Sequence, residues 1–397
     1  MPADPFHGAT APELGLVIIG SGLAGYTVAR EFRKLDRVTP VTVVTADGGE
    51  VYAKPMLSNF FGQKKTLESL VQKQSGAVAE ELGGTILSHH RVVSIDRKAR
   101  TFTAIDATGV TRTIGWRRLV LALGADPRPY EVAGSDTVPV ATVNSLDDYR
   151  RFLSALPTGG TVLLIGAGLI GSEFANDLIA GGYRVTVVDP AAWPLGRLVP
   201  KQVGDALAEA LREAGATLHL GHSIRRLEVG AKKFVAFLDD GTEISFDRAL
   251  SAIGLLPRTA IAREAGLDVA QGVVVDRLLR TSDPDIFAVG DCAQTPVGVL
   301  SFVLPLMAQA RAVAATLAGT ETPLRLPALP VAVKTPALPI VVCAPRPDDD
   351  GGWEVEGSGR SLKAIFSTAA GAAGFALSGA STIERQAFTK NIPELFG

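Results

Sequence analysis

Two glycine-rich loops of the form G-x-G-x-x-G lie in this 397-residue chain. The first consists of Gly20, Ser21, Gly22, Leu23, Ala24 and Gly25, and the second of Gly166, Ala167, Gly168, Leu169, Ile170 and Gly171. In such a loop the first glycine permits a tight turn, the second lets backbone approach a pyrophosphate, and the third lets helix pack on strand. One loop holds one dinucleotide. Two loops therefore predict two dinucleotides that exchange electrons, most simply a flavin and a nicotinamide.

The sequence around each loop supports this interpretation. Apolar runs at 16–19 and 162–165 predict a strand before each loop, and further strands are predicted at 41–44 and 185–188. After the second loop, Ile170, Phe174 and Leu178 recur at helical spacing. The pattern strand, loop, helix, strand is thus present twice, which makes the loops stronger signals than the glycines alone.

The residue that ends the second strand differs between the two units. In the second unit it is Asp189, which would accept hydrogen bonds from a ribose 2′-OH and repel a 2′-phosphate, so NADH is favoured over NADPH. In the first unit it is Thr45, with Asp47 two residues further on. Either residue could hold the ribose of the first dinucleotide.

The order of predicted elements indicates an α/β fold with two Rossmann-like dinucleotide-binding domains and a small α+β C-terminal domain. A linker is predicted at 126–129, and the apolar run at 250–257 would return the chain to the first domain. A proline-rich stretch follows from 323 to 347. We expect a discontinuous first dinucleotide-binding domain (1–125 and 250–322), a second dinucleotide-binding domain (126–249) and a C-terminal interface domain (323–397).

Composition excludes several other classes of protein. Because 47% of residues are hydrophobic, the chain can form a buried core. The net charge is −2, so nothing indicates nucleic acid as a partner. No apolar run reaches the length of a membrane span, and the acidic, proline-broken start does not resemble a signal peptide, so we expect a cytoplasmic protein. The two cysteines cannot form a C-x-x-C pair. We expect no metal site, because no cysteine or acidic set accompanies the histidine pairs His89–His90 and His219–His222.

A further motif carries a family resemblance. The run 281–293, Thr-Ser-Asp-Pro-Asp-Ile-Phe-Ala-Val-Gly-Asp-Cys-Ala, resembles the second FAD-binding motif of pyridine-nucleotide-dependent flavin reductases. The resemblance implies a glutathione-reductase-like fold, FAD on the first loop, and NAD(P)H on the second. It also implies that Asp291 binds the ribityl chain of the flavin.

Two shorter motifs narrow the resemblance. No cysteine precedes Cys292, so a thiol relay of the disulfide-reductase kind is not available. The run 52–58, Tyr-Ala-Lys-Pro-Met-Leu-Ser, and the run 333–336, Val-Lys-Thr-Pro, resemble the bacterial rubredoxin reductases of alkane-oxidising pathways and their flavorubredoxin relatives. This resemblance implies that electrons pass from NADH through FAD to rubredoxin, an acidic iron protein that accepts one electron at a time.

The resemblance also assigns site residues. Lys54, beside Pro55, would place a cation near the flavin, unless it is an ordinary surface lysine, and Lys334 is a second candidate for that cation. Glu173 would lie near the nicotinamide, although an acid in a first helical turn also favours the helix dipole. The remaining cofactor contacts would come from Val93, Ala122, Gly124, Gly254 and Gly290.

Some alternatives remain open. Arg30, Arg33, Lys34 and Arg37 at helical spacing could form a docking patch for an acidic partner or simply a solvated helix face. The resemblance implies that a helix predicted to begin at Leu304, with Gly319 as its C-cap, points its N-terminus at the flavin, and an ordinary packing helix is the alternative. The carrier could also be a ferredoxin or flavorubredoxin, and a non-catalytic signalling flavoprotein is a rival of another class.

Overall fold

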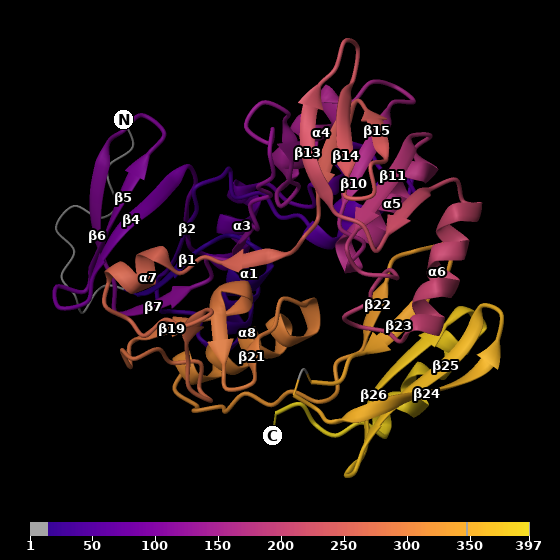
Figure 1. Ribbon diagram of the computed structural model, residues 1–397. Coiled ribbons are helices and arrows are strands. Elements are labelled where there is room, and N and C mark those ends of the chain that lie inside the picture. Colours follow the sequence, from indigo (N-terminus) through magenta and orange to yellow (C-terminus); the bar gives the residue numbers. More distant parts are fainter. Residues whose placement is uncertain (1–14, 347, 397) are drawn as a thin grey trace.

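The computed structural model describes residues 15–346 and 348–396, and its first unit is built on a five-stranded parallel sheet in the order β19-β7-β1-β2-β3 (Figure 1). The strands are β1 (Leu16–Ile19), β2 (Val41–Val44), β3 (Thr85–Leu87), β7 (Arg118–Leu121) and β19 (Ile286–Ala288), and the main helices are α1 (Leu23–Leu35), α3 (Ser75–Leu82) and α8 (Val303–Leu317). Every residue of β1 and β2 is buried. This explains their continuous apolar sequence, which is typical of strands in a parallel sheet covered on both faces.

The second unit repeats this plan. Its sheet has the order β12-β11-β10-β16-β9, in which all neighbours are parallel. The strands are β9 (Val140–Ala141), β10 (Thr161–Ile165), β11 (Arg184–Asp189), β12 (Thr217–Leu220) and β16 (Arg248–Ser251), and the helices are α4 (Leu146–Ala155), α5 (Leu169–Ala180) and α6 (Lys201–Glu213). An antiparallel sheet of β13 (Ile224–Val229), β14 (Phe234–Leu238) and β15 (Glu243–Phe246) packs beside it.

The chain enters and leaves the second unit along one two-stranded ribbon. The antiparallel strands β8 (Ala125–Pro127) and β17 (Leu255–Pro257) form this ribbon. The backbone N–H of Arg128 donates to the carbonyl of Gly254, and that of Arg258 donates to the carbonyl of Gly124. On this basis we propose domain boundaries near residues 125 and 250, with a third boundary near residue 322.

Smaller elements complete the first unit. They are the antiparallel sheet of β4 (His90–Asp96), β5 (Thr101–Asp106) and β6 (Thr111–Gly115), and the sheet of β18 (Val273–Val274), β20 (Ala293–Thr295) and β21 (Gly298–Val299). The short helices are η2 (Lys54–Asn59), α2 (Leu67–Leu70), α7 (Ala260–Glu264) and η3 (Gly290–Cys292).

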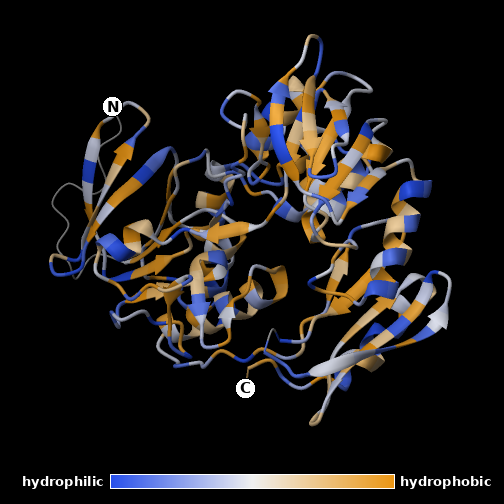
Figure 2. Cartoon of the chain, in the orientation of Figure 1, coloured by the Kyte–Doolittle hydropathy of each residue, from blue (hydrophilic) through white to orange (hydrophobic). Residues whose placement is uncertain are grey.

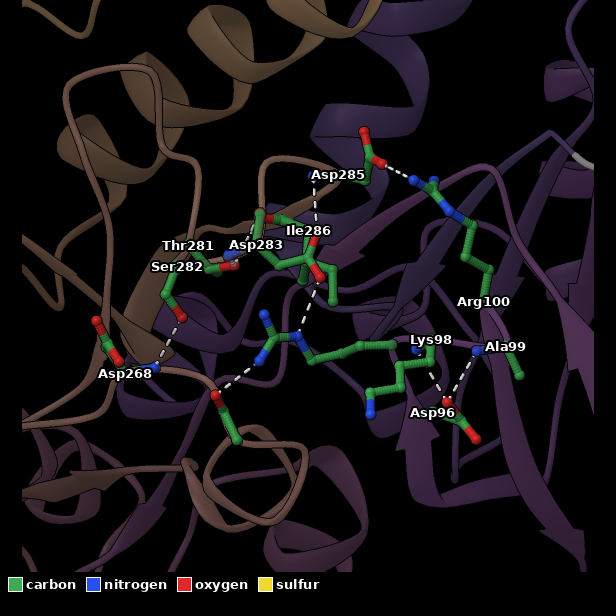
Figure 3. Close-up of polar contacts among 12 residues, drawn as sticks. Asp96, Lys98, Ala99, Arg100, Asp268, Thr281, Ser282, Asp283, Asp285 and Ile286 are labelled. Carbon is green, nitrogen blue, oxygen red and sulfur yellow. Dashed lines mark hydrogen bonds and ion pairs between the residues drawn. The ribbon is translucent and has the colours of Figure 1, made fainter.

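Ion pairs anchor the start of the 281–293 motif (Figure 3). Arg97 Nε donates to Asp283 at 3.0 Å, and Arg100 and Arg118 both pair with Asp285. Asp285 is almost buried, so the two arginines compensate for its desolvation. Asp283 and Asp285 therefore hold the start of strand β19 in place. The segment that carries Asp291 follows directly after this strand.

The C-terminal unit is a five-stranded antiparallel sheet in the order β22-β23-β26-β25-β24. Its elements are β22 (Val331–Val333), β23 (Ile340–Cys343), β24 (Gly351–Ser358), β25 (Ser361–Thr368), β26 (Gly371–Ser378), η4 (Gly379–Glu384) and α9 (Arg385–Lys390). Most of the alanine- and glycine-rich run near 369–380 forms β26, which is buried in its second half, from residue 374 to residue 378.

One hydrophobic core joins parts of all three units. It includes Leu57 and Phe60 beside η2, Phe174 on α5, and Val333 and Ile340 on the C-terminal sheet. Figure 2 shows the central strands as mainly hydrophobic. The three segments that meet here are the ones that carry Lys54, Glu173 and Lys334, so the site is built over a packed junction.

Candidate cofactor and electron-transfer site

The first glycine loop joins β1 to α1. Gly20 has a φ of +115°, and a Cβ there would lie 2.2 Å from the carbonyl oxygen of Ala122. A Cβ on Gly25 would lie 1.9 Å from the carbonyl oxygen of Gly20. A Cβ on Gly22 would instead have no atom of the described chain within 4 Å. The fold itself requires the outer two glycines, whereas the middle one keeps space clear beside the backbone, as a bound pyrophosphate would need.

The second loop, between β10 and α5, has the same geometry. A Cβ on Gly166 would lie 2.9 Å from the carbonyl oxygen of Ala252, and one on Gly171 would lie 2.0 Å from that of Gly166. A Cβ on Gly168 would again meet nothing within 4 Å among the described residues. Gly22 and Gly168 are the N-caps of α1 and α5, and neither helix start has a side-chain cap. Their first N–H groups are available to an anion.

The end of β2 brings together the two residues that the sequence left as alternatives. The Thr45 hydroxyl donates to Asp47 Oδ1 at 2.6 Å, and the Ser21 hydroxyl lies 2.8 Å from Thr45 Oγ1. Gly49 N–H also donates to Asp47 Oδ1, at 3.0 Å. Thr45 is buried, whereas Asp47 is exposed, and within the described chain Oδ2 of Asp47 accepts none of these bonds. Asp47 is thus the better placed acceptor for a ribose.

Asp189 lies at the end of β11, as predicted, and it also supports the second loop. Its Oδ2 accepts a hydrogen bond from Ala167 N–H at 2.5 Å, and its Oδ1 accepts one from Ala191 N–H at 2.7 Å. A carboxylate oxygen can accept more than one hydrogen bond, so both oxygens remain able to accept from a ribose.

Lys54 and Asp291 face the same region from η2 and η3. Lys54 is exposed but partly surrounded by protein, and this desolvation lowers the pKa of its ammonium group. The negative charge of Asp291 has the opposite effect and raises that pKa. Burial raises the pKa of Asp291, and the charge of Lys54 lowers it. Lys54 Nζ donates to Asn144 Oδ1 at 3.4 Å, and no carboxylate of the described residues pairs with it directly. The ammonium is therefore not neutralised by an ion pair within that part of the protein.

Glu173 lies at the centre of a buried network. The carboxylate is 0% exposed and accepts hydrogen bonds from the Ser58 hydroxyl at 2.6 Å, from Lys334 N–H at 3.0 Å and from Lys334 Nζ at 2.5 Å. The three residues come from η2, from α5 and from the segment after β22. The two sequence candidates Glu173 and Lys334 thus form one ion pair, and Lys54 lies outside it.

The remaining predicted contacts lie at turns and irregular backbone positions. Val93 falls at the register shift of β4 against β5, which leaves it without a ladder partner, as at a β-bulge. Gly124, Gly254 and Gly290 have φ values of +72°, +111° and +73°. The N–H of Gly290 donates to Gln309 Oε1 at 2.7 Å. Ala122 directly follows β7, and Pro55 lies in the first turn of η2.

The helix predicted to point at the flavin begins one residue earlier than expected, at Val303, and ends at Leu317. Its N-cap, Phe302, makes no side-chain hydrogen bond to the first turn. Gly319 follows the helix end with a φ of +99°, as expected for a residue that terminates a helix.

The structure does not support a docking patch on α1. Arg30 pairs with Glu81, Arg33 donates to the carbonyls of Leu82 and Asp36, and Lys34 pairs with Glu31. Arg37 lies beyond the end of the helix. These cations are engaged in contacts within the unit, which favours the alternative of a solvated helix face.

One expectation about the histidines was wrong. His222 Nδ1 lies 3.0 Å from Asp239 and 3.7 Å from Asp240, so acidic residues do accompany it. Both carboxylates also accept backbone N–H groups, from Ser223 and Thr242 respectively. These bonds explain the cluster as part of two local turns, one between β12 and β13 and one between β14 and β15. The sequence spacing did not reveal that the two turns meet.

Sequence analysis also missed the roles of Ser58, Asn176 and Asp177. Ser58 is the last residue of the 52–58 run, and it bonds Glu173. Asn176 and Asp177 are buried on α5, three and four residues after Glu173. That spacing places all three on one helix face, and it was a signal that could have been used.

The cysteines are structural. Burial raises the pKa of Cys292 to about 11, and burial also raises the pKa of Cys343. Because the thiolate is the reactive form, burial lowers the reactivity of both thiols. We expect a Cys292→Ser, Cys343→Ser double variant to retain NADH-dependent electron output in a steady-state assay. Loss of turnover with FAD still bound would reveal a thiol function.

Two glycine loops of dinucleotide-binding geometry, with the Glu173–Lys334 ion pair on the helix that follows the second loop, define a two-cofactor oxidoreductase. The chain belongs to the pyridine nucleotide-disulphide oxidoreductase family, whose profile matches residues 15–314. The profile of a rubredoxin binding C-terminal domain matches residues 323–392. These matches confirm the predicted fold class and the predicted family.

Known relatives match along nearly the whole chain. The rubredoxin-NAD(+) reductase of Alcanivorax borkumensis is 41% identical over 96% of this chain and 99% of its own length. The rubredoxin-NAD(+) reductase of Acinetobacter baylyi is 39% identical over 96% of this chain and 98% of its own. Among solved structures, putidaredoxin reductase in its covalent complex with putidaredoxin has a TM-score of 0.85 and 26% identity, covering 95% of this chain and 93% of its own.

None of the helices in the described part of the chain combines the length and the apolar character needed to cross a lipid bilayer.

Proposed function

We propose that this protein is an FAD-dependent reductase that passes electrons from NADH to rubredoxin. One observation carries the proposal. The C-terminal unit, which resembles a rubredoxin-binding domain, supplies Lys334 to the Glu173 network on the helix that begins at the second glycine loop. The partner-binding unit and the coenzyme-binding unit therefore share one buried ion pair.

The residues present fit both cofactors. Gly20 to Gly25 and the N-terminus of α1 would hold the FAD pyrophosphate, Asp47 the ribose, the free backbone at Val93 the adenine, and Asp291 the ribityl chain. Gly166 to Gly171 and Asp189 would hold NADH. FAD, when bound, supplies the conversion of a two-electron donor into single electrons that an iron protein can accept. The protein supplies orientation and charge around it.

Lys54 supplies charge in this scheme. Its ammonium is exposed toward the same region as Asp291 and has no ion pair among the described residues. It can therefore stabilise negative charge that develops on a reduced cofactor. Lys334 contributes less net charge, because Glu173 neutralises it.

Lys54→Met is expected to lower the flavin midpoint potential. One charge beside a partly solvated ring contributes about 1–3 kcal/mol, or about 20–60 mV for a two-electron couple. Spectroelectrochemistry measures this shift, and FAD content should change little because the pyrophosphate lies at the glycine loop. An unchanged potential would indicate that Lys334, and not Lys54, supplies the positive charge near the flavin.

The preference for NADH is expected to depend on Asp189. Asp189→Ala should reduce the ratio of kcat/KM for NADH to that for NADPH by about tenfold, since a like charge near the 2′-phosphate is removed. Because Asp189 also accepts bonds from Ala167 and Ala191, the KM for NADH should rise as well. Asp189→Asn, which keeps an acceptor, is the control. A ratio that stays constant in both variants would contradict the argument.

The partner is tested by comparing carriers. Purified protein with NADH is assayed with a rubredoxin, a [2Fe–2S] ferredoxin and a flavorubredoxin at equal concentration. We expect the highest kcat/KM with rubredoxin, and a fall in rate at high salt if the contact is electrostatic. A higher kcat/KM with either other carrier would reassign the partner, and no turnover with any carrier would favour a binding or signalling role. We propose a cytoplasmic location because NADH, the electron donor, is found there.

A further inference from the structure

Helix α5 is buried all round from residue 171 to residue 178, and one of its faces there is polar. Glu173, Asn176 and Asp177 are 0%, 8% and 2% exposed. Their spacing of three and four residues places them side by side on the helix. Helices normally bury an apolar stripe, and a buried polar group is costly unless it is hydrogen-bonded. A face of this kind therefore needs a specific set of partners.

The partners of Asn176 and Asp177 are backbone N–H groups from two other units. Asn176 Oδ1 accepts from Ala337 N–H at 2.9 Å. Asp177 Oδ2 accepts from Phe60 N–H at 3.0 Å, and its Oδ1 accepts from Gly62 N–H at 2.9 Å. Bonds to backbone fix the course of the chain, so these side chains determine where the two segments run against α5.

Each of the two segments carries one lysine of the site. Phe60 directly follows η2, which begins at Lys54, and Ala337 lies three residues after Lys334. The first of these segments packs closely against α5, and the second is itself buried. The ring of Phe61 lies so near α5 that a Cβ on Gly181 would be 2.7 Å from it, and Thr335 is buried beside Leu338.

We propose that Asn176 and Asp177 are positioning residues for electron transfer. Asn176 holds Lys334, and Asp177 holds Lys54, at fixed places relative to the helix whose N-terminus forms the second glycine loop. The inference rests on the proposed function, and it adds the residues that set the geometry of the two cations. Displacements of about 1 Å in such a site can change rates by about a hundredfold.

A double-mutant cycle tests the role of Asn176. Wild type, Asn176→Ala, Lys334→Met and the double variant are compared in NADH-dependent rubredoxin reduction. Asn176→Ala is expected to lower kcat about tenfold while the KM for NADH changes less than about twofold. In the Lys334→Met background it should cause no further loss, because residues that act through one another are not additive. Additive losses would show a merely structural role and overturn the proposal.

The flavin midpoint potential gives a readout that does not need the partner. If Asn176 acts through Lys334, Asn176→Ala should shift the potential in the same direction as Lys334→Met, and the double variant should shift no further. An unchanged potential in Asn176→Ala would count against the proposal. If the wild type fails to reduce rubredoxin, the proposed function fails, and these potentials still decide the positioning role.

A second cycle and a matched control complete the design. Asp177→Asn, which keeps the shape and one acceptor oxygen, is combined with Lys54→Met in the same two assays, and the same non-additivity is expected. It also remains informative if Asn176→Ala does not fold. Thr316→Ala is the control, because the buried Thr316 hydroxyl, in the last turn of α8, likewise accepts a backbone N–H, from Thr322 after the helix end. Its effect should be small and additive with Lys334→Met.

Discussion

Gly22→Ala is expected to yield a folded protein that has lost most of its FAD and therefore its activity. A Cβ at this position meets no atom of the described chain within 4 Å, so folding should tolerate it. The methyl group would instead occupy the space beside the helix N-terminus that the pyrophosphate needs. An overpacking cost of about 1–3 kcal/mol corresponds to about 5- to 150-fold weaker binding.

Gly168→Ala is the matched variant in the other loop. It should keep its FAD and its yellow colour, while the KM for NADH rises by a similar factor. FAD content by absorbance, circular dichroism and steady-state kinetics distinguish the two variants. If both lost FAD equally, or if Gly22→Ala bound FAD normally, the assignment of one cofactor to each loop would be refuted.

Lys334→Met is expected to destabilise the protein more than any other single lysine change in the site. It leaves the Glu173 carboxylate, which is 0% exposed, without its counter-charge. Breaking a fully buried pair costs about 3–5 kcal/mol. Since the Lys334 side chain is 26% exposed, we expect about 2–4 kcal/mol in the free energy of unfolding, measured by urea denaturation.

Lys54→Met is the control for that measurement. It makes the same chemical change at an ammonium that has no ion pair among the described residues, so stability should change by less than about 1 kcal/mol. Equal losses of stability in the two variants would show that the ion pair with Glu173 adds nothing to the fold.

The sequence predicted the parts of the site that depend on neighbouring residues. These parts are the glycine loops, the strands beside them and the acid at Asp189. Each depends on residues that are close together in the sequence, so the turn, the strand and the helix N-terminus can be predicted directly. The position of Asp291 after a strand was likewise predictable, although the anchoring role of Asp283 and Asp285 was not.

The Glu173 network could not be predicted in the same way. Ser58 and Lys334 are separated from Glu173 by 115 and 161 residues, and their meeting depends on how three units pack. The resemblance placed Glu173 and Lys334 near the cofactors, but it did not indicate that they pair with each other. The buried face of α5 was visible as three polar residues at helical spacing, yet their partners are backbone groups, which carry no signature in the sequence.

The ribbon of β8 and β17 has a consequence for protein engineering. Because the chain enters and leaves the second unit on adjacent antiparallel strands, that unit is topologically an insertion whose two ends meet. Such a module can be excised and replaced at the ribbon, as domain insertions at neighbouring termini are well tolerated. A transplanted coenzyme module would need to carry the pattern Glu-x-x-Asn-Asp on the helix that follows its glycine loop. Without that pattern the graft would lack the side chains that hydrogen-bond the backbone of the other two units.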